Sequence, residues 1–106
     1  MSAFLQQAED ILEVAVAGNR CGAGDVAILI DRQGGMRMLD PTGWSLPALS
    51  AEFGASAVYR VERRGGAVRV EGWGGGQRCL IQRDTQFTPW QPTLYPLLRL
   101  RLTGRP

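Results

Sequence analysis

Residues 57–73 read AVYRVERRGGAVRVEGW, and this stretch decides the fold. Apolar and charged residues alternate on both sides of a Gly-Gly pair, which is typical of two half-buried strands joined by a tight turn. A two-residue turn at 65–66 brings opposite charges together across the strands and leaves the valines on the other face, so it predicts an antiparallel hairpin with a wet charged face and a buried apolar face. The opposed pairs are Arg60 with Glu71, Glu62 with Arg69, Val61 with Val70, and Tyr59 with the bare Gly72.

A third strand continues this meander after the glycine run at 74–76. A tight turn at 74–75 favours one register, and a shift of one residue would turn Leu80 toward the core instead. The favoured register pairs Val70 with Cys79, Val68 with Ile81, and Glu71 with Arg78.

A second hairpin is expected upstream of the meander. Residues 26–30 are apolar at every position, which indicates a central strand buried on both faces. The chain then turns near residues 33–34 and returns to Leu39. The expected pairs are Leu29 with Met38 and Ile28 with Leu39, and Asp31 and Asp40 are expected to cap the turns at the two ends of this hairpin.

Two helices are expected to flank the first hairpin. In residues 2–18 the apolar side chains recur at three- and four-residue steps, with Ser2 as N-cap. The stripe consists of Phe4, Leu5, Ala8, Ile11, Leu12, Ala15 and Val16. A shorter helix follows Ser45, ends at Gly54, and is expected to dock on the sheet through Leu46, Leu49 and Phe53.

The C-terminal part is less regular. Residues 85–96 form a proline-containing arm, and the alternation of leucine and arginine over 97–102 favours a strand there, with a short helix as the alternative. The whole chain, 1–106, is expected to be one soluble α+β domain with its helices on one face of a single sheet. Because strand 26–30 needs cover on both faces, the arm or another subunit is expected to cover the second face.

Several classes of function are excluded by composition. The chain has no histidine, and all twelve basic residues are arginines, so a Ser-His-Asp triad, Schiff-base chemistry and a P-loop lysine are absent. The glycine loop at 22–24 precedes a strand, whereas a dinucleotide-binding loop precedes a helix. We therefore expect no catalytic residue, no cofactor and no metal.

The cysteines and the apolar segments indicate the compartment. Two cysteines, Cys21 and Cys79, are too few for a secreted disulfide scaffold, and no apolar run is long enough to cross a bilayer. A cytoplasmic protein without membrane contact is the expectation. Cys79 is expected to be a small core side chain, and Cys21 a loop residue.

The remaining candidates are binding residues. Tryptophans exceed what a small core can bury, so Trp44, Trp73 and Trp90, together with Tyr95, are candidates for contact with a protein partner or a second copy. The alternative is a small-molecule or anion site at Arg20 or Arg37. Six arginines near the meander (60, 63, 64, 69, 78 and 83) raise a third hypothesis, an RNA-binding sheet. The net charge of +2 and the interleaved glutamates argue against nucleic acid as the partner.

Overall fold

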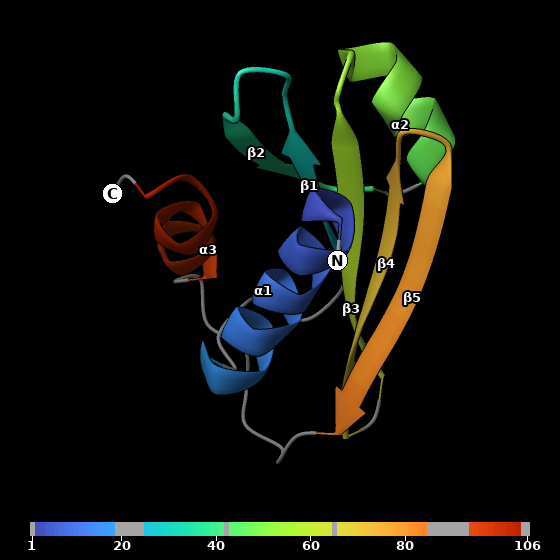
Figure 1. Ribbon diagram of the computed structural model, residues 1–106. Coiled ribbons are helices and arrows are strands. Elements are labelled where there is room, and N and C mark those ends of the chain that lie inside the picture. The colour runs from blue at the N-terminus through green and yellow to red at the C-terminus, as the bar shows by residue number, and fades with distance from the viewer. Residues whose placement is uncertain (1, 19–24, 42, 65, 85–93, 105–106) are drawn as a thin grey trace.

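The computed structural model describes residues 2–18, 25–41, 43–64, 66–84 and 94–104. Within this part of the chain, three helices accompany one antiparallel sheet with the strand order β2-β1-β3-β4-β5 (Figure 1). The elements are α1 (Ala3–Gly18), β1 (Val26–Ile30), β2 (Met36–Leu39), α2 (Leu46–Phe53), β3 (Ala57–Arg64), β4 (Ala67–Gly74), β5 (Gln77–Asp84) and α3 (Leu94–Thr103). The predicted α+β class is confirmed, and the sheet has five strands: the hairpin plus a three-stranded meander.

The β3-β4 hairpin has the register that its charges predict. Arg60 lies opposite Glu71 and Tyr59 opposite Gly72, and the two remaining predicted pairs also hold. The Tyr59 ring is fully buried and stacks on Phe4, with 5.5 Å between the ring centroids. The charged face is less wet than expected, because Glu62 is only 4% exposed.

Helix α1 covers one face of this sheet. Its N-terminus is capped as predicted, since the backbone N–H of Leu5 donates to the hydroxyl of Ser2 at 3.2 Å. The stripe packs against Ile28, Tyr59 and Val61, whose side chains all point to the same face, the α1 face. The buried side chains of the helix are Ala8, Ile11, Leu12, Val14 and Ala15. Leu5, at the border of the stripe, is exposed instead.

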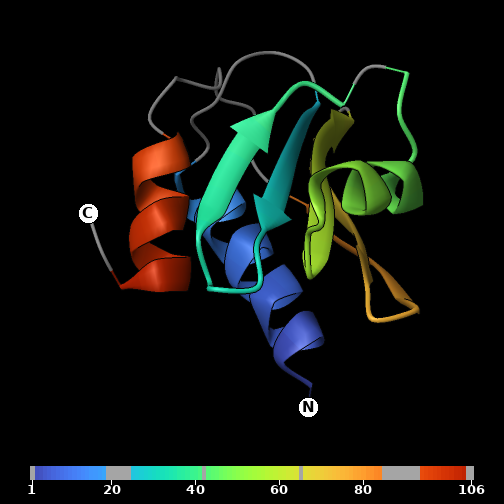
Figure 2. The same ribbon diagram turned by 90° about the horizontal axis from the view of Figure 1, so that it is seen from above.

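Helix α2 covers the opposite face, so the expectation that all helices lie on one face is wrong. Leu46 and Leu49 form a second buried cluster with Ala27, Leu29 and Val58, which alternate along their strands with the residues of the α1 face. Figure 2 shows the sheet between α1 and α2. This helix supplies the cover on the second face that the apolar strand 26–30 requires.

The local signals for α2 are confirmed, with one exception. The backbone N–H of Ala48 donates to the Ser45 hydroxyl at 3.2 Å, and Gly54 ends the helix with a φ of +61°. Phe53 does not enter the core, because 44% of it is exposed.

The strand predicted for 97–102 is wrong, because these residues belong to helix α3. Leu98 is fully buried against the core, whereas Leu100 is 53% exposed, so alternate leucines do not share a face. Helix α3 packs against α1, and the guanidinium of Arg101 lies 3.2 Å from Glu13 and 3.8 Å from Asp10. The contacts with α1 stabilise the helical form, and the local pattern of leucine and arginine does not reveal them.

The predicted register of the first hairpin is wrong by one residue. Leu29 lies opposite Arg37 rather than Met38, and Ile28 lies opposite Met38. The connection is longer than a two-residue turn, since the Asp31 carboxylate accepts from the backbone N–H of Gln33 at 2.9 Å and of Gly35 at 2.7 Å. The predicted turn role of Asp31 is therefore confirmed.

The β4-β5 register is also wrong, by two residues. Val70 lies opposite Ile81 and Gly72 opposite Cys79, because the turn residues are Gly75 and Gly76. Their φ values are +57° and +78°, as a type I′ turn requires at both central positions. The shift is even, so Cys79 and Ile81 still point to the α1 face, where they pack against the core as predicted for Cys79.

Candidate functional site

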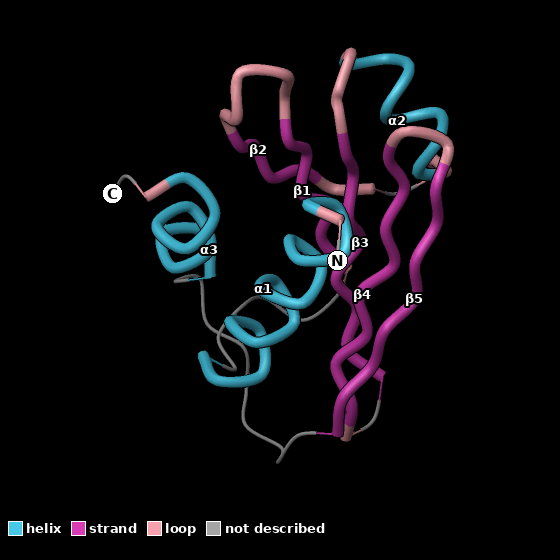
Figure 3. The backbone as a smooth tube through the Cα atoms, in the orientation of Figure 1, coloured by secondary structure: helices cyan, strands magenta, loops and turns pink. Residues whose placement is uncertain are grey.

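Strand β5 forms a long edge of the sheet. In the described part of the chain it pairs only with β4, and Figure 3 shows no other helix or strand on its outer side. All eight residues, Gln77–Asp84, pair in sequence with β4, so the strand has no bulge, and it contains no proline. Proline and bulges are two of the devices that protect natural sheet edges from further pairing. The opposite edge, β2, is half as long, with four residues.

The turn geometry determines which backbone groups line this edge. Gly74 and Gln77 flank the two-residue turn and therefore form a hydrogen-bonded pair. From there the direction alternates, so the N–H and C=O groups of Cys79 and Ile81 point toward β4. The outward groups belong to Arg78, Leu80, Gln82 and Asp84.

The side chain of Leu80 makes this edge apolar as well as unpaired. It points to the α2 face, opposite Glu71, and 57% of it is exposed, the largest value among the exposed large hydrophobic side chains of the described residues. Leu80 was not among the sequence candidates. Its outward direction follows from strand parity, but its position on an edge depends on the strand order of the whole sheet.

Beside Leu80 lies a second feature, which we call the tryptophan surface: Trp44, Arg60, Glu71, Trp73 and Arg78. The Arg78 guanidinium lies over the Trp73 ring at 5.6 Å, and Arg60 lies 3.8 Å from Glu71. Arg60 also donates to the carbonyl oxygen of Trp44 at 2.9 Å. A hollow of about 130 Å³, lined by the four strand residues of this surface but not by Trp44, lies between them and the start of α2. The surface is continuous with the outer edge of β5, because Arg78 belongs to both.

The predicted interface residues have different outcomes. The structure brings Trp44 and Trp73 into the tryptophan surface, where Trp44 is 44% exposed and Trp73 is half-buried. Tyr95 lies in the first turn of α3, a different part of the fold. Trp90 and the arm over 85–93 lie outside the described residues, as do Arg20 and Cys21.

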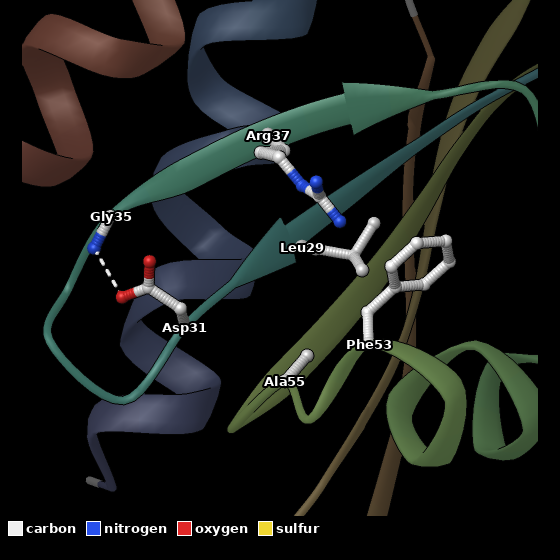
Figure 4. Close-up of a pocket in the computed structure, with 6 residues that line it drawn as sticks. All are labelled: Leu29, Asp31, Gly35, Arg37, Phe53 and Ala55. Carbon is white, nitrogen blue, oxygen red and sulfur yellow. Dashed lines mark hydrogen bonds between the residues drawn. The ribbon is translucent and has the colours of Figure 1, made fainter.

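Arg37, the second anion candidate, lines an open pocket on the α2 face. The pocket has a volume of about 290 Å³ and is formed by Leu29, Asp31, Gly35, Arg37, Phe53 and Ala55 (Figure 4). The Arg37 guanidinium lies over the Phe53 ring at 4.8 Å, which holds its charge at the mouth of the pocket. The Asp31 carboxylate faces the turn and is used by its backbone N–H groups, as the dashed line to Gly35 shows.

No protein-family model, curated protein or solved structure matches this chain. The site must therefore be interpreted from its own chemistry.

The arginines of the meander do not form one platform. Strand parity places Arg60, Arg69 and Arg78 on the α2 face, whereas Arg63 and Arg83 are in line with Val68, which is buried on the α1 face. Arg83 lies 3.7 Å from Glu9 of α1. These residues therefore do not form a single arginine-rich sheet face of the kind that binds RNA.

The buried Tyr59 and the partly buried Cys79 of the α1 face are held in their neutral forms. Burial raises the pKa of Tyr59 well above its ordinary value, and its hydroxyl lies 2.8 Å from the Phe4 carbonyl oxygen. Burial likewise raises the pKa of the Cys79 thiol, while the backbone N–H of Gly72 opposes the shift. Neither group is an activated nucleophile.

The described residues contain no group of three or more His, Cys, Asp or Glu side chains arranged to hold a metal ion. None of their helices is both long enough and apolar enough to span a membrane.

Proposed function

We propose that this protein is a non-catalytic protein-interaction module that binds a polypeptide along the outer edge of β5. The observation that carries the proposal is the combination of outward backbone groups and exposed Leu80 on an eight-residue strand without proline or bulge. An added strand satisfies such groups by main-chain hydrogen bonds, and its side chains find pockets beside the edge.

The tryptophan surface provides the side-chain part of this interface. Tryptophan and arginine are the residues that contribute most to binding energy when they lie beside an apolar contact. Trp73 is half-buried and stacked by Arg78, so it offers a rigid ring next to Leu80, while Trp44 remains exposed at the rim.

Site-directed photo-cross-linking tests this proposal. A photoreactive amino acid replaces Leu80 in the full chain, which is expressed in the cytoplasm, the compartment in which we place the protein. Leu100 on α3, 53% exposed, is the matched control position. We expect an adduct of discrete mass from position 80 that is absent from position 100. Equal labelling at both positions, or none at position 80, would contradict the proposal.

A second candidate function is the binding of a small anion at Arg37. The observation that favours it is the arginine held over Phe53 at the mouth of the 290 Å³ pocket. A bound ligand would stabilise the fold by about 2.7 kcal/mol at 100 times its Kd. A melting-temperature screen with carboxylates and phosphates checks this, and the Arg37→Gln variant is the control. A shift that persists in the variant, or no shift at all, would count against this site.

A further inference from the structure

We infer that the polypeptide bound at the β5 edge is the β5 strand of a second copy of this chain. The two strands run antiparallel around a two-fold axis at Ile81, which joins two five-stranded sheets into one continuous sheet. This inference rests on the proposed function and names its partner.

Symmetry limits the registers that such a pair can adopt. In an antiparallel sheet, residues directly opposite each other share a face. The two-fold axis must therefore place one residue opposite the same residue of the second copy, and it cannot fall between two successive residues of the strand. Four axis positions near the middle of β5 satisfy this condition: Cys79, Leu80, Ile81 and Gln82.

Charge selects among these four positions. Asp84 is the only acidic residue of β5, and Arg78 lies as far before Ile81 as Asp84 lies after it. An axis at Ile81 therefore places Arg78 of each copy opposite Asp84 of the other, which makes two ion pairs. An axis at Leu80 places Arg78 opposite Gln82, and an axis at Cys79 places it opposite Leu80. An axis at Gln82 places Asp84 opposite Leu80, so all three leave Asp84 without a basic partner.

The axis at Ile81 also pairs the outward backbone N–H and C=O groups of the two strands. Arg78, Leu80, Gln82 and Asp84 are the residues whose N–H and C=O groups point outward, and each lies opposite another member of this set. Every outward group of the strand from 78 to 84 thus acquires a hydrogen-bond partner. The opposed pairs are Arg78 with Asp84, Leu80 with Gln82, Cys79 with Arg83, and Ile81 with its own counterpart.

No like charges face each other in this arrangement. Arg83 comes opposite the neutral Cys79 thiol and remains within 3.7 Å of Glu9 on its own α1. Leu80 comes opposite Gln82 of the second copy and remains beside Glu71, a member of the tryptophan surface of its own copy. One strand therefore supplies both halves of a complementary interface, which is what a two-fold contact requires.

Charge reversal tests the register directly. In Arg78→Asp two aspartates meet at both contacts of the dimer, and in Asp84→Arg two arginines meet, so each variant alone is expected to dimerise roughly tenfold more weakly than the wild type. A mixture of the two variants places Asp against Arg at both contacts. Sedimentation velocity is expected to show dimers in the mixture and in the double variant, with monomers in each single variant at the same concentration.

Matched controls exclude an effect of net charge. Arg32→Asp and Glu52→Arg change the net charge by the same amounts. Arg32 is exposed in the turn between β1 and β2, and Glu52 is exposed on α2. These variants are expected to dimerise like the wild type, alone and mixed. Far-ultraviolet circular dichroism of every variant confirms that the fold is intact.

The outcomes separate this inference from the proposed function. Failure of the mixture to dimerise, or a wild-type chain that stays monomeric at millimolar concentration, would overturn the second-copy inference. If the Leu80 cross-link then joins a different protein, the proposed function still stands without a self-partner. If position 80 gives no specific cross-link either, both fail.

Discussion

The contact between β4, β5 and the α1 face predicts a strong effect of one methyl group at Gly72. A Cβ at this position would lie 2.7 Å from the Cys79 sulfur, 2.9 Å from Cδ1 of Tyr59 and 3.0 Å from Cζ of Phe4. Replacing a strand glycine normally gains about 0.5–1 kcal/mol, whereas overpacking a filled core costs about 1–3 kcal/mol. The steric cost exceeds the gain, so we expect Gly72→Ala to lower the free energy of unfolding by about 1–2 kcal/mol.

Urea unfolding followed by tryptophan fluorescence measures this difference. The Cys79→Ala variant provides the matched background, because it removes the sulfur that makes the shortest of the three contacts. In a double-mutant cycle, Gly72→Ala is expected to cost less in the Cys79→Ala background than in the wild type. A cost below about 0.5 kcal/mol in the wild type, or an equal cost in both backgrounds, would refute the packing described for Gly72.

Three further predictions concern α3 and the two neutral side chains. Leu98→Ala is expected to cost about 2–5 kcal/mol and Leu100→Ala less than about 0.5 kcal/mol, by the same unfolding assay; similar costs would contradict the helix. Because the pKa of Tyr59 is raised above its ordinary value of 10.0, the unfolded chain ionises first and stability falls as the pH rises above 10. Tyr59→Phe should lose this part of the alkaline dependence, and an unchanged profile would speak against it. Because the pKa of Cys79 is raised, mass spectrometry should find its alkylation at pH 8 slower in the folded than in the urea-unfolded protein, and equal rates would disprove its protection.

The sequence predicts elements well where several local signals agree. The β3-β4 register follows from two charge pairs and one glycine facing an aromatic ring, and only one alignment satisfies all of them. The ends of α2 follow from Ser45 and Gly54, whose cap geometry depends on no distant residue.

The sequence does not predict an element or a strand register correctly where contacts with distant residues, or a choice between successive glycines, determine it. Leucines at 98, 100 and 102 fit a strand and also fit a helix whose buried positions are 98 and 102, and only the contact with α1 separates the two. Three successive glycines at 74–76 allow two turns of equal local quality. In the first hairpin, the Asp31 side chain closes a longer turn that changes the register.

The sequence likewise indicates some features of the candidate site and not others. Trp44 and Trp73 are candidates from composition alone, since a small core has no room for every large ring. Leu80 was missed because exposure on an edge depends on the strand order, which places β5 outermost. The cover of the second face by α2 likewise depends on the crossover between the hairpin and the meander.

Amide hydrogen exchange along β5 tests the central claim most directly. In the isolated chain, protection should alternate, with Cys79 and Ile81 protected by β4 and Leu80 and Gln82 exchanging freely. If β5 is a binding edge used by a second copy, raising the protein concentration should protect Leu80 and Gln82 as strongly as their neighbours. An alternating pattern that persists at every concentration would contradict this account.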